Sequence, residues 1–126
     1  MDQKTYNAYC ASLPHTNHVV QWGGADVWKV GAGPEKPKLN KVFAIATWGE
    51  GKHSGITFKV SDLAYEVLQQ MEGLRPAPYL ASRGMKWIQH HAEPGLDDAA
   101  LREHLAEAHH LVARNLPKKL RDELGL

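Results

Sequence analysis

The short connections between strand-like segments constrain the fold of this chain more than any other feature. Residues 41–48 form the most apolar of these segments, and residues 56–60 alternate apolar and polar side chains, which is typical of a strand with one buried face. The glycine-rich connection between them, residues 49–55, is far too short for a helical crossover and predicts a flexible hairpin tip. The two strands are therefore expected to be antiparallel neighbours, and most of the sheet should follow the same rule.

Further strands are predicted on both sides of this pair. Residues 18–22 and 27–30 are β-prone, and the Gly-Gly-Ala-Asp segment between them suits a tight turn. Residues 31–40 hold two glycines, two prolines and three charged side chains, so we expect an exposed loop without regular structure there. The last strand is predicted at residues 85–91, after two prolines break the chain.

Helical periodicity occurs in four segments. The first helix covers residues 2–13, Ser61 caps a second that ends near Gly73, a third begins at Asp97, and a short fourth follows Pro117. In the second helix, the side expected to face the core consists of Leu63, Ala64, Val67, Leu68 and Met71. The expected fold is α+β, a largely antiparallel twisted sheet with helices packed on one face, in a single domain over residues 1–126.

The composition is that of an ordinary globular chain. Hydrophobic residues make up 43% and charged residues 23%, which indicates neither disorder nor a fibrous repeat. The longest apolar run, residues 42–48, is far too short to cross a bilayer, and the amino terminus has no signal-peptide pattern. The single Cys10 cannot form a disulfide within the chain. We therefore expect a cytoplasmic monomer that does not associate with membranes.

Eight histidines suggest a metal site, but their spacing does not support one. His104, His109 and His110 lie five, six and one residues apart, whereas two ligands on one helical face need a separation of three or four. His90 and His91 are neighbours on a strand and therefore point to opposite faces. We expect surface or capping histidines, with no metal and no cofactor.

The sequence holds no clear catalytic motif. Residues 51–55, Gly-Lys-His-Ser-Gly, do not place serine at the centre of Gly-x-Ser-x-Gly or on a strand-to-helix turn. The glycines at residues 31–33 and 49–51 lack the flanking residues of phosphate-binding loops. Cys10 lies on the apolar stripe of its helix, so we expect a small core residue rather than a nucleophile. No enzyme activity is predicted.

Charge is distributed unevenly along the chain. The formal net charge is only +1, which excludes the overall signature of a strongly basic nucleic-acid binder. Residues 29–59 nevertheless contain six lysines against two glutamates, whereas residues 93–107 contain five acids against one arginine. A molecule with one basic and one acidic side is expected, and a basic patch matters more than the net charge when the partner is a polyanion.

Two exposed basic loops are candidate phosphate contacts. Lys36, Lys38 and Lys41 lie in or beside residues 31–40, and Lys52 lies at the tip formed by residues 49–55. Flexible basic hairpins can straddle a phosphate backbone without reading bases. Because lysines also keep a surface soluble, a solvated surface without a partner is the alternative interpretation.

Several segments resemble sequences of the MmcQ/YjbR family. The resemblance is carried mainly by Tyr79-Leu-Ala-Ser-Arg-Gly-Met-Lys-Trp-Ile-Gln89 and Asn115-Leu-Pro-Lys-Lys-Leu-Arg-Asp-Glu-Leu124. Residues 9–14 and 27–31 are similar to the start of the family, so the resemblance covers essentially the whole chain. It implies a CyaY-like fold and a small bacterial cytoplasmic protein that binds DNA through a double wing, with no assigned reaction. The sequence departs from the family pattern in a longer first hairpin and in residues 82–85.

We therefore predict weak, largely sequence-nonspecific binding to the phosphates of duplex DNA. The candidate nucleic-acid contacts are Lys36, Lys38, Lys41, Lys52, Arg83, Lys86, Lys118, Lys119 and Arg121. Trp87 is expected to be a core or edge anchor rather than a platform for base stacking.

A second function is kept as an alternative. A small-molecule or protein-binding module would use a sheet face lined by some of the four tryptophans, Trp22, Trp28, Trp48 and Trp87. An enzyme is the third possibility.

Overall fold

The computed structural model describes residues 1–78, 80 and 83–126. Its main element is a six-stranded sheet with the order β1-β2-β3-β4-β6-β5, in which every pairing is antiparallel. The strands are β1 Thr16–Gln21, β2 Ala25–Gly31, β3 Asn40–Thr47, β4 Gly55–Lys59, β5 Leu74–Pro76 and β6 Trp87–His90. The antiparallel sheet predicted from the short connections is confirmed.

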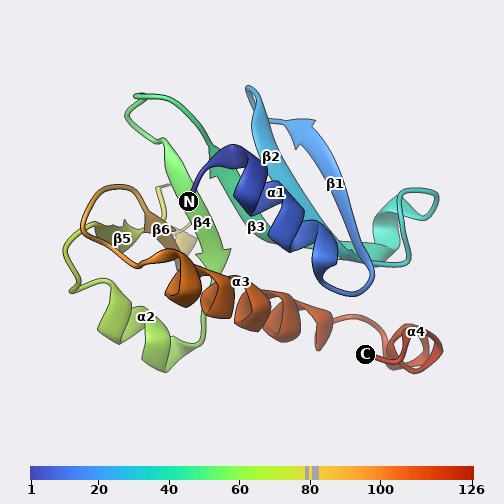
Figure 1. Cartoon of the computed structure of the whole chain (residues 1–126). Helices are drawn as coiled ribbons and strands as arrows, with labels where there is room; N and C mark the ends of the chain where they lie inside the picture. Colours follow the sequence, from blue (N-terminus) through green and yellow to red (C-terminus); the bar gives the residue numbers. More distant parts are fainter. Residues whose placement is uncertain (79, 81–82) are drawn as a thin grey trace.

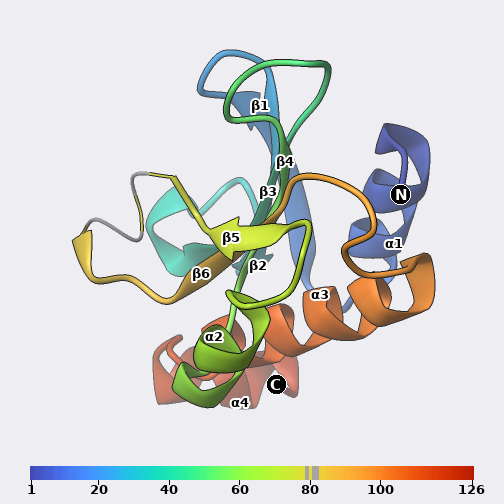
Figure 2. The ribbon, with the colours of Figure 1, turned by 90° about the vertical axis from the view of Figure 1, so that its left-hand side faces the viewer.

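Four α-helices accompany the sheet in the described part of the chain. They are α1 Gln3–Ser12, α2 Asp62–Leu68, α3 Asp98–Ala113 and α4 Lys118–Leu124. Figure 2 shows α1 and α3 on the same face of the sheet, where α3 contacts β2, β3 and β4. The core between these layers includes Tyr6, Phe43, Phe58, Leu101 and Leu105, all without solvent exposure. The predicted α+β fold with helices on one face is therefore confirmed.

The first helix follows its sequence signals closely. The Asp2 side chain accepts a hydrogen bond from the Thr5 backbone N–H at 2.8 Å, which caps the helix, and the helix stops before Pro14. Cys10 is fully buried, and this burial raises the pKa of its thiol to about 12. The expectation of a small core residue at Cys10 is confirmed.

The second helix begins as predicted but faces solvent more than expected. Ser61 caps it by accepting a hydrogen bond from the Ala64 N–H, yet the helix ends at Leu68, and Leu68 is its only buried residue. Leu63 is 76% exposed, Val67 56% and Met71 38%, so the predicted core side is wrong at these positions. These side chains are exposed because α2 lies beside the short strand β5, at the margin of the sheet, whereas α3 covers the centre of the sheet.

The segment of residues 31–40 is more ordered than the sequence predicted. A 3-10 helix, η1 Pro37–Leu39, interrupts it, and the Asn40 side chain organises the rest. The Asn40 amide donates to the carbonyls of Gly33 and Lys36, and its oxygen accepts from the Gly33 N–H. An added Cβ at Gly31 would lie 2.0 Å from the Leu39 carbonyl oxygen, so only glycine fits this close approach. The expectation of no regular structure is therefore wrong for residues 37–39.

Two further boundaries differ from the prediction. The segment expected to be broken by prolines contains the edge strand β5, which tolerates Pro76 because one side of an edge strand needs no ladder hydrogen bond. Asp26, which was expected in a turn, belongs to β2, and the turn consists of residues 22–24.

None of the helices among the described residues has the length and apolar content needed to cross a bilayer.

Candidate nucleic-acid interface

The two lysine-containing loops lie at opposite ends of β3. In consecutive antiparallel strands the connections alternate between the two ends of the sheet, so the β2–β3 and β3–β4 connections are separated by the length of β3 (Figure 1). Eight residues of strand correspond to about 25 Å. Lys36 and Lys38 are therefore not brought together with Lys52.

A different basic surface is formed where the β2–β3 connection meets α4. Lys36 and Lys119 line the same hollow of about 240 Å³, although they are far apart in the sequence. Leu39 and Leu120 also line this hollow, and both pack against the hydrophobic core, which holds α4 next to the connection. Packing of apolar side chains thus places two lysine-bearing segments at one end of the molecule.

Six of the nine predicted contacts gather at this end of the molecule, which we call the basic end. They are Lys36, Lys38, Lys41, Lys118, Lys119 and Arg121. Among the described residues, the only one of these six in an ion pair is Lys118, which lies 3.0 Å from Asp122 on the exposed side of α4. The other lysines are exposed and have no acidic partner within the described part of the chain. Glu35, Asp122 and Glu123 reduce the local charge without reversing it.

Arg114 lies beside Arg121 and adds a further cation next to the basic end. Both line a second hollow of about 530 Å³, together with His109 and His110. The Arg121 Nε donates to the Leu116 carbonyl oxygen at 3.1 Å, which orients the guanidinium group. Arg114 was not among the predicted contacts, although it directly precedes the segment 115–124 that holds three of them.

The β3–β4 tip, which carries Lys52, is fixed to the sheet. Arg75 donates from Nη2 to the Lys52 carbonyl oxygen at 3.0 Å and from Nε to the Gln89 side chain at 2.8 Å. Gln89, which is only 4% exposed, donates in turn to the His53 carbonyl oxygen at 2.8 Å. The tip expected to be a flexible wing is therefore tied through its backbone to β5 and β6.

Arg83 and Lys86 belong to the segment before β6, which β4 separates from β3. The Lys86 Nζ lies 4.5 Å from the ring centroid of Tyr65, a residue of α2, so its charge is engaged in a cation–π contact. Arg83 is exposed. Of the segment that carries the family resemblance, residues 79, 81 and 82 lie outside the described residues.

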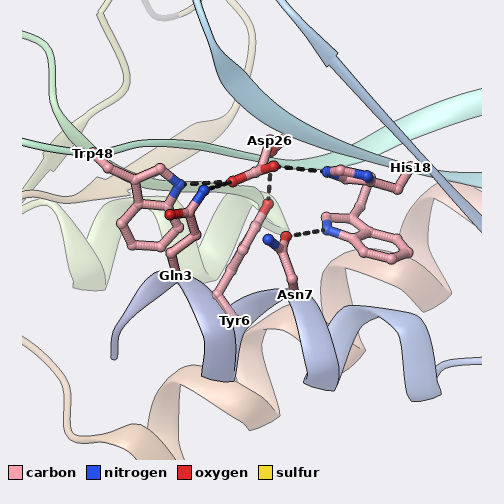
Figure 3. A network of polar contacts seen from close by, with 7 residues as sticks. Gln3, Tyr6, Asn7, His18, Asp26 and Trp48 are labelled. Carbon is pink, nitrogen blue, oxygen red and sulfur yellow. Dashed lines mark hydrogen bonds and ion pairs between the residues drawn. The ribbon is translucent and has the colours of Figure 1, made fainter.

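A buried polar network surrounds Asp26, which is only 3% exposed (Figure 3). Gln3 Nε2 and Trp48 Nε1 each donate to Oδ2 at 2.8 Å, and His18 Nε2 lies 2.7 Å from Oδ1. The Tyr6 hydroxyl donates to the Asp26 carbonyl oxygen at 3.1 Å. Burial would raise the pKa of Asp26, but the hydrogen bonds from Gln3, His18 and Trp48 to its carboxylate help to hold the pKa below its ordinary value.

This network fastens α1 to the sheet. Gln3 and Tyr6 come from α1, while His18 and Asp26 come from β1 and β2. Trp28 adds a further link, because its Nε1 donates to the Asn7 side chain at 2.9 Å. Both carboxylate oxygens of Asp26 are already occupied by protein donors, so we assign the cluster a structural role.

The four tryptophans do not line a common sheet face. Trp28 is 7% exposed and lies under α1. Trp87, a residue of β6, is 6% exposed, so its side chain is a buried anchor as expected. The indole of Trp48 is bound to Asp26. Trp22 is 63% exposed but lies on the turn between β1 and β2. Of the four, Trp48 lines a hollow of about 260 Å³ at the β3–β4 end of the sheet.

The overall arrangement agrees with known proteins. The sequence model of the YjbR family matches residues 11–111, most of the chain. The chain belongs to the YjbR family. The crystal structure of Deinococcus radiodurans protein DR2400, described as carrying the domain DUF419, has a TM-score of 0.79 at 22% identity and covers 96% of this chain and 86% of that one. This likeness shows that the two proteins share a fold. A search of curated proteins found no match to the sequence.

The YjbR match includes only part of the basic end. It contains Lys36, Lys38 and Lys41 but stops before α4, which begins at Lys118. The α4 lysines therefore derive no support from the family match, and their place in the interface depends on their position beside the β2–β3 connection.

Among the histidines of this YjbR-family chain, His109 differs from the expected surface or capping position. It is 6% exposed, its Nε2 lies 2.7 Å from the Pro14 carbonyl oxygen, and its ring meets Phe43 edge-on. His109 is buried because it follows the buried Leu105 by four residues and therefore lies on the same inner side of α3.

No group of three or more histidine, cysteine or acidic side chains suited to a metal ion occurs in residues 1–78, 80 and 83–126.

Proposed function

We propose that this protein binds the phosphate backbone of duplex DNA through the basic end. The observation that carries the proposal is the shared hollow that joins the β2–β3 connection to α4, whose charged lining residues are Lys36, Lys119 and Glu123. Several exposed ammonium groups without acidic partners suit a row of phosphates, because their binding releases counterions condensed on the DNA. The proposed activity is binding alone, without a chemical reaction.

The proposed contacts favour phosphates over bases. Five of the six residues of the basic end are lysines, whose flexible ammonium groups act as point charges and do not impose the bidentate geometry that reads a guanine edge. We therefore expect weak binding with little sequence preference and a strong dependence on salt.

The test compares charge reversal at the two ends of β3. We expect the double substitution Lys36→Glu with Lys119→Glu to weaken binding of a labelled duplex at low salt by at least about tenfold, measured by fluorescence anisotropy. The slope of affinity against salt concentration should decrease by about two, the number of phosphate contacts removed. Lys52→Glu is the control for each single substitution, Lys36→Glu and Lys119→Glu, because it reverses one charge at the opposite end of the sheet.

Two results would overturn this proposal. One is a duplex affinity that the double substitution leaves unchanged. The other is a loss confined to Lys52→Glu, which would place the contact at the β3–β4 tip instead.

A further inference from the structure

The two edge strands of the sheet differ in how well they are protected. An edge strand presents unpaired N–H and C=O groups, which proteins usually shield with short strands, prolines, bulges or charged side chains. The edge strand β5 has three residues, includes Arg75 and ends at Pro76. The other edge, β1, has six residues, Thr-Asn-His-Val-Val-Gln, without proline, lysine, arginine or acid, and its register with β2 contains no bulge. Only β5 is shielded in these ways.

The unprotected edge also carries exposed apolar side chains. Val20, on β1, is 58% exposed, and Trp22, directly after the strand, is 63% exposed. The one titratable side chain of β1, His18, is engaged with Asp26 at 2.7 Å. Trp22 has a φ of +54°, a conformation that is costly for a large side chain and that occurs preferentially at functional positions. The edge therefore carries no lysine, arginine or acid along its length and is apolar at one end.

We propose that β1 pairs antiparallel with β1 of a second copy of this chain, which would continue the sheet from one copy into the other. In such a pair, facing residues must lie on the same side of the sheet. A two-fold axis through Val19 satisfies this rule: it places Val19 opposite Val19, His18 opposite Val20 and Asn17 opposite Gln21. Trp22 then lies opposite Thr16 at the end of the paired stretch.

This register is more self-complementary than one with the axis through His18. The β-branched Val19 residues meet at the axis, and Gln21 of one copy faces Asn17 of the other. The Asn17 Nδ2 donates to the Asn40 Oδ1 of its own chain at 2.9 Å, so its oxygen is the group that faces the Gln21 amide as an acceptor. An axis through His18 would instead set two imidazoles against each other and leave Trp22 beyond the paired residues. An edge without lysine, arginine or acid offers no pattern that selects a charged peptide, so a second copy fits it better than a charged partner strand.

The proposed dimer departs from the monomer expected from the sequence and is independent of DNA binding. A single strand pair buries a small interface, so we expect the dimer to dissociate on dilution.

Sedimentation velocity from micromolar to millimolar protein tests the pairing. We expect a monomer–dimer equilibrium whose dissociation constant rises by at least about tenfold in Val20→Lys, because a lysine on the edge opposes pairing. Val20 is exposed, so this variant should keep its fold. Leu63→Lys, on the exposed side of α2, is the matched control and should leave the dissociation constant unchanged.

Hydrogen exchange locates the contact on the intact protein. Outward-facing amides of residues 16–21 should exchange more slowly as the protein concentration rises, whereas amides of β5 should not change. The proposal is overturned by a monomer at every concentration, by a dimer that Val20→Lys leaves intact or Leu63→Lys weakens equally, or by exchange in β1 that does not depend on concentration.

Discussion

The buried carboxylate of Asp26 binds α1 to the sheet through hydrogen bonds. A buried carboxylate is costly unless its charge is matched by donors, and Gln3, Trp48 and His18 supply them at 2.7 to 2.8 Å. Because these donors come from α1, β1 and the end of β3, they fix three parts of the chain to one carboxylate. The sequence offered little warning, since an aspartate beside two glycines is also typical of a turn.

Replacing this carboxylate should destabilise the fold. We expect Asp26→Asn to lower the free energy of unfolding by about 2–4 kcal/mol, because the new amide nitrogen would face donors that lose their acceptor. Urea unfolding followed by tryptophan fluorescence measures the change. Asp122→Asn, which removes the exposed ion pair with Lys118, is the control and should change stability by less than about 1 kcal/mol. Equal effects of the two substitutions would contradict the role assigned to Asp26.

The pH dependence of this effect has a definite sign. The pKa of Asp26 is lower in the folded protein than its ordinary value of 3.8, so its contribution is fully present above that value. It is lost as the pH falls through the folded pKa. The stability difference between wild type and Asp26→Asn should therefore shrink at pH values below about 4. A difference that stays constant down to the acid-unfolding range would show that the charge is not responsible.

At the scale of elements, local sequence signals predicted where helices and strands begin. Which of their side chains are buried depends on how the elements pack against each other. Capping by Ser61 and the alternation in β4 were visible in the sequence. The exposure of Leu63 depends on how much of the sheet α3 already covers, which no local pattern contains. The strand β5 was missed because Pro76 is acceptable only at an edge, and edges are a property of the assembled sheet.

The attachment of the β3–β4 tip is a second feature that only the assembled sheet reveals. Arg75→Ala removes a donor to the Lys52 carbonyl oxygen, and we expect a loss of about 1–2 kcal/mol together with faster amide exchange at residues 52–54. Lys52→Ala is the control, because the contact uses its backbone and not its side chain. Unchanged exchange in Arg75→Ala would indicate that the turn itself holds the tip.

His109, on the buried side of α3, should make the stability of the fold sensitive to mild acid. Burial lowers the pKa of His109 below its ordinary value of 6.5, although its bond to the Pro14 carbonyl acts in the opposite direction. The unfolded chain therefore takes up a proton first, and stability should fall as the pH decreases from about 6.5. Thermal unfolding at pH 7 and pH 5 should show a smaller loss in His109→Gln than in wild type or in the exposed control His110→Gln. An identical loss in all three would exclude His109 as a source.

At the scale of the whole molecule, the charges separate into distinct regions. The basic end contains six cationic side chains, whereas α3 exposes Asp98, Glu103 and Glu107 on its solvent side. The sequence predicted this unevenness from composition alone, but it grouped Lys52 with Lys36 because it contained no information about which end of the sheet each loop occupies. The meeting of α4 with the β2–β3 connection is a tertiary contact and had no local signal.

The most direct measurement is a titration of the labelled protein with duplex DNA, followed by backbone amide chemical shifts at two salt concentrations. Binding through the basic end predicts shifts at residues 33–41 and 114–124 that weaken steeply as salt increases. Shifts confined to residues 49–55, or an absence of shifts at low salt, would contradict it.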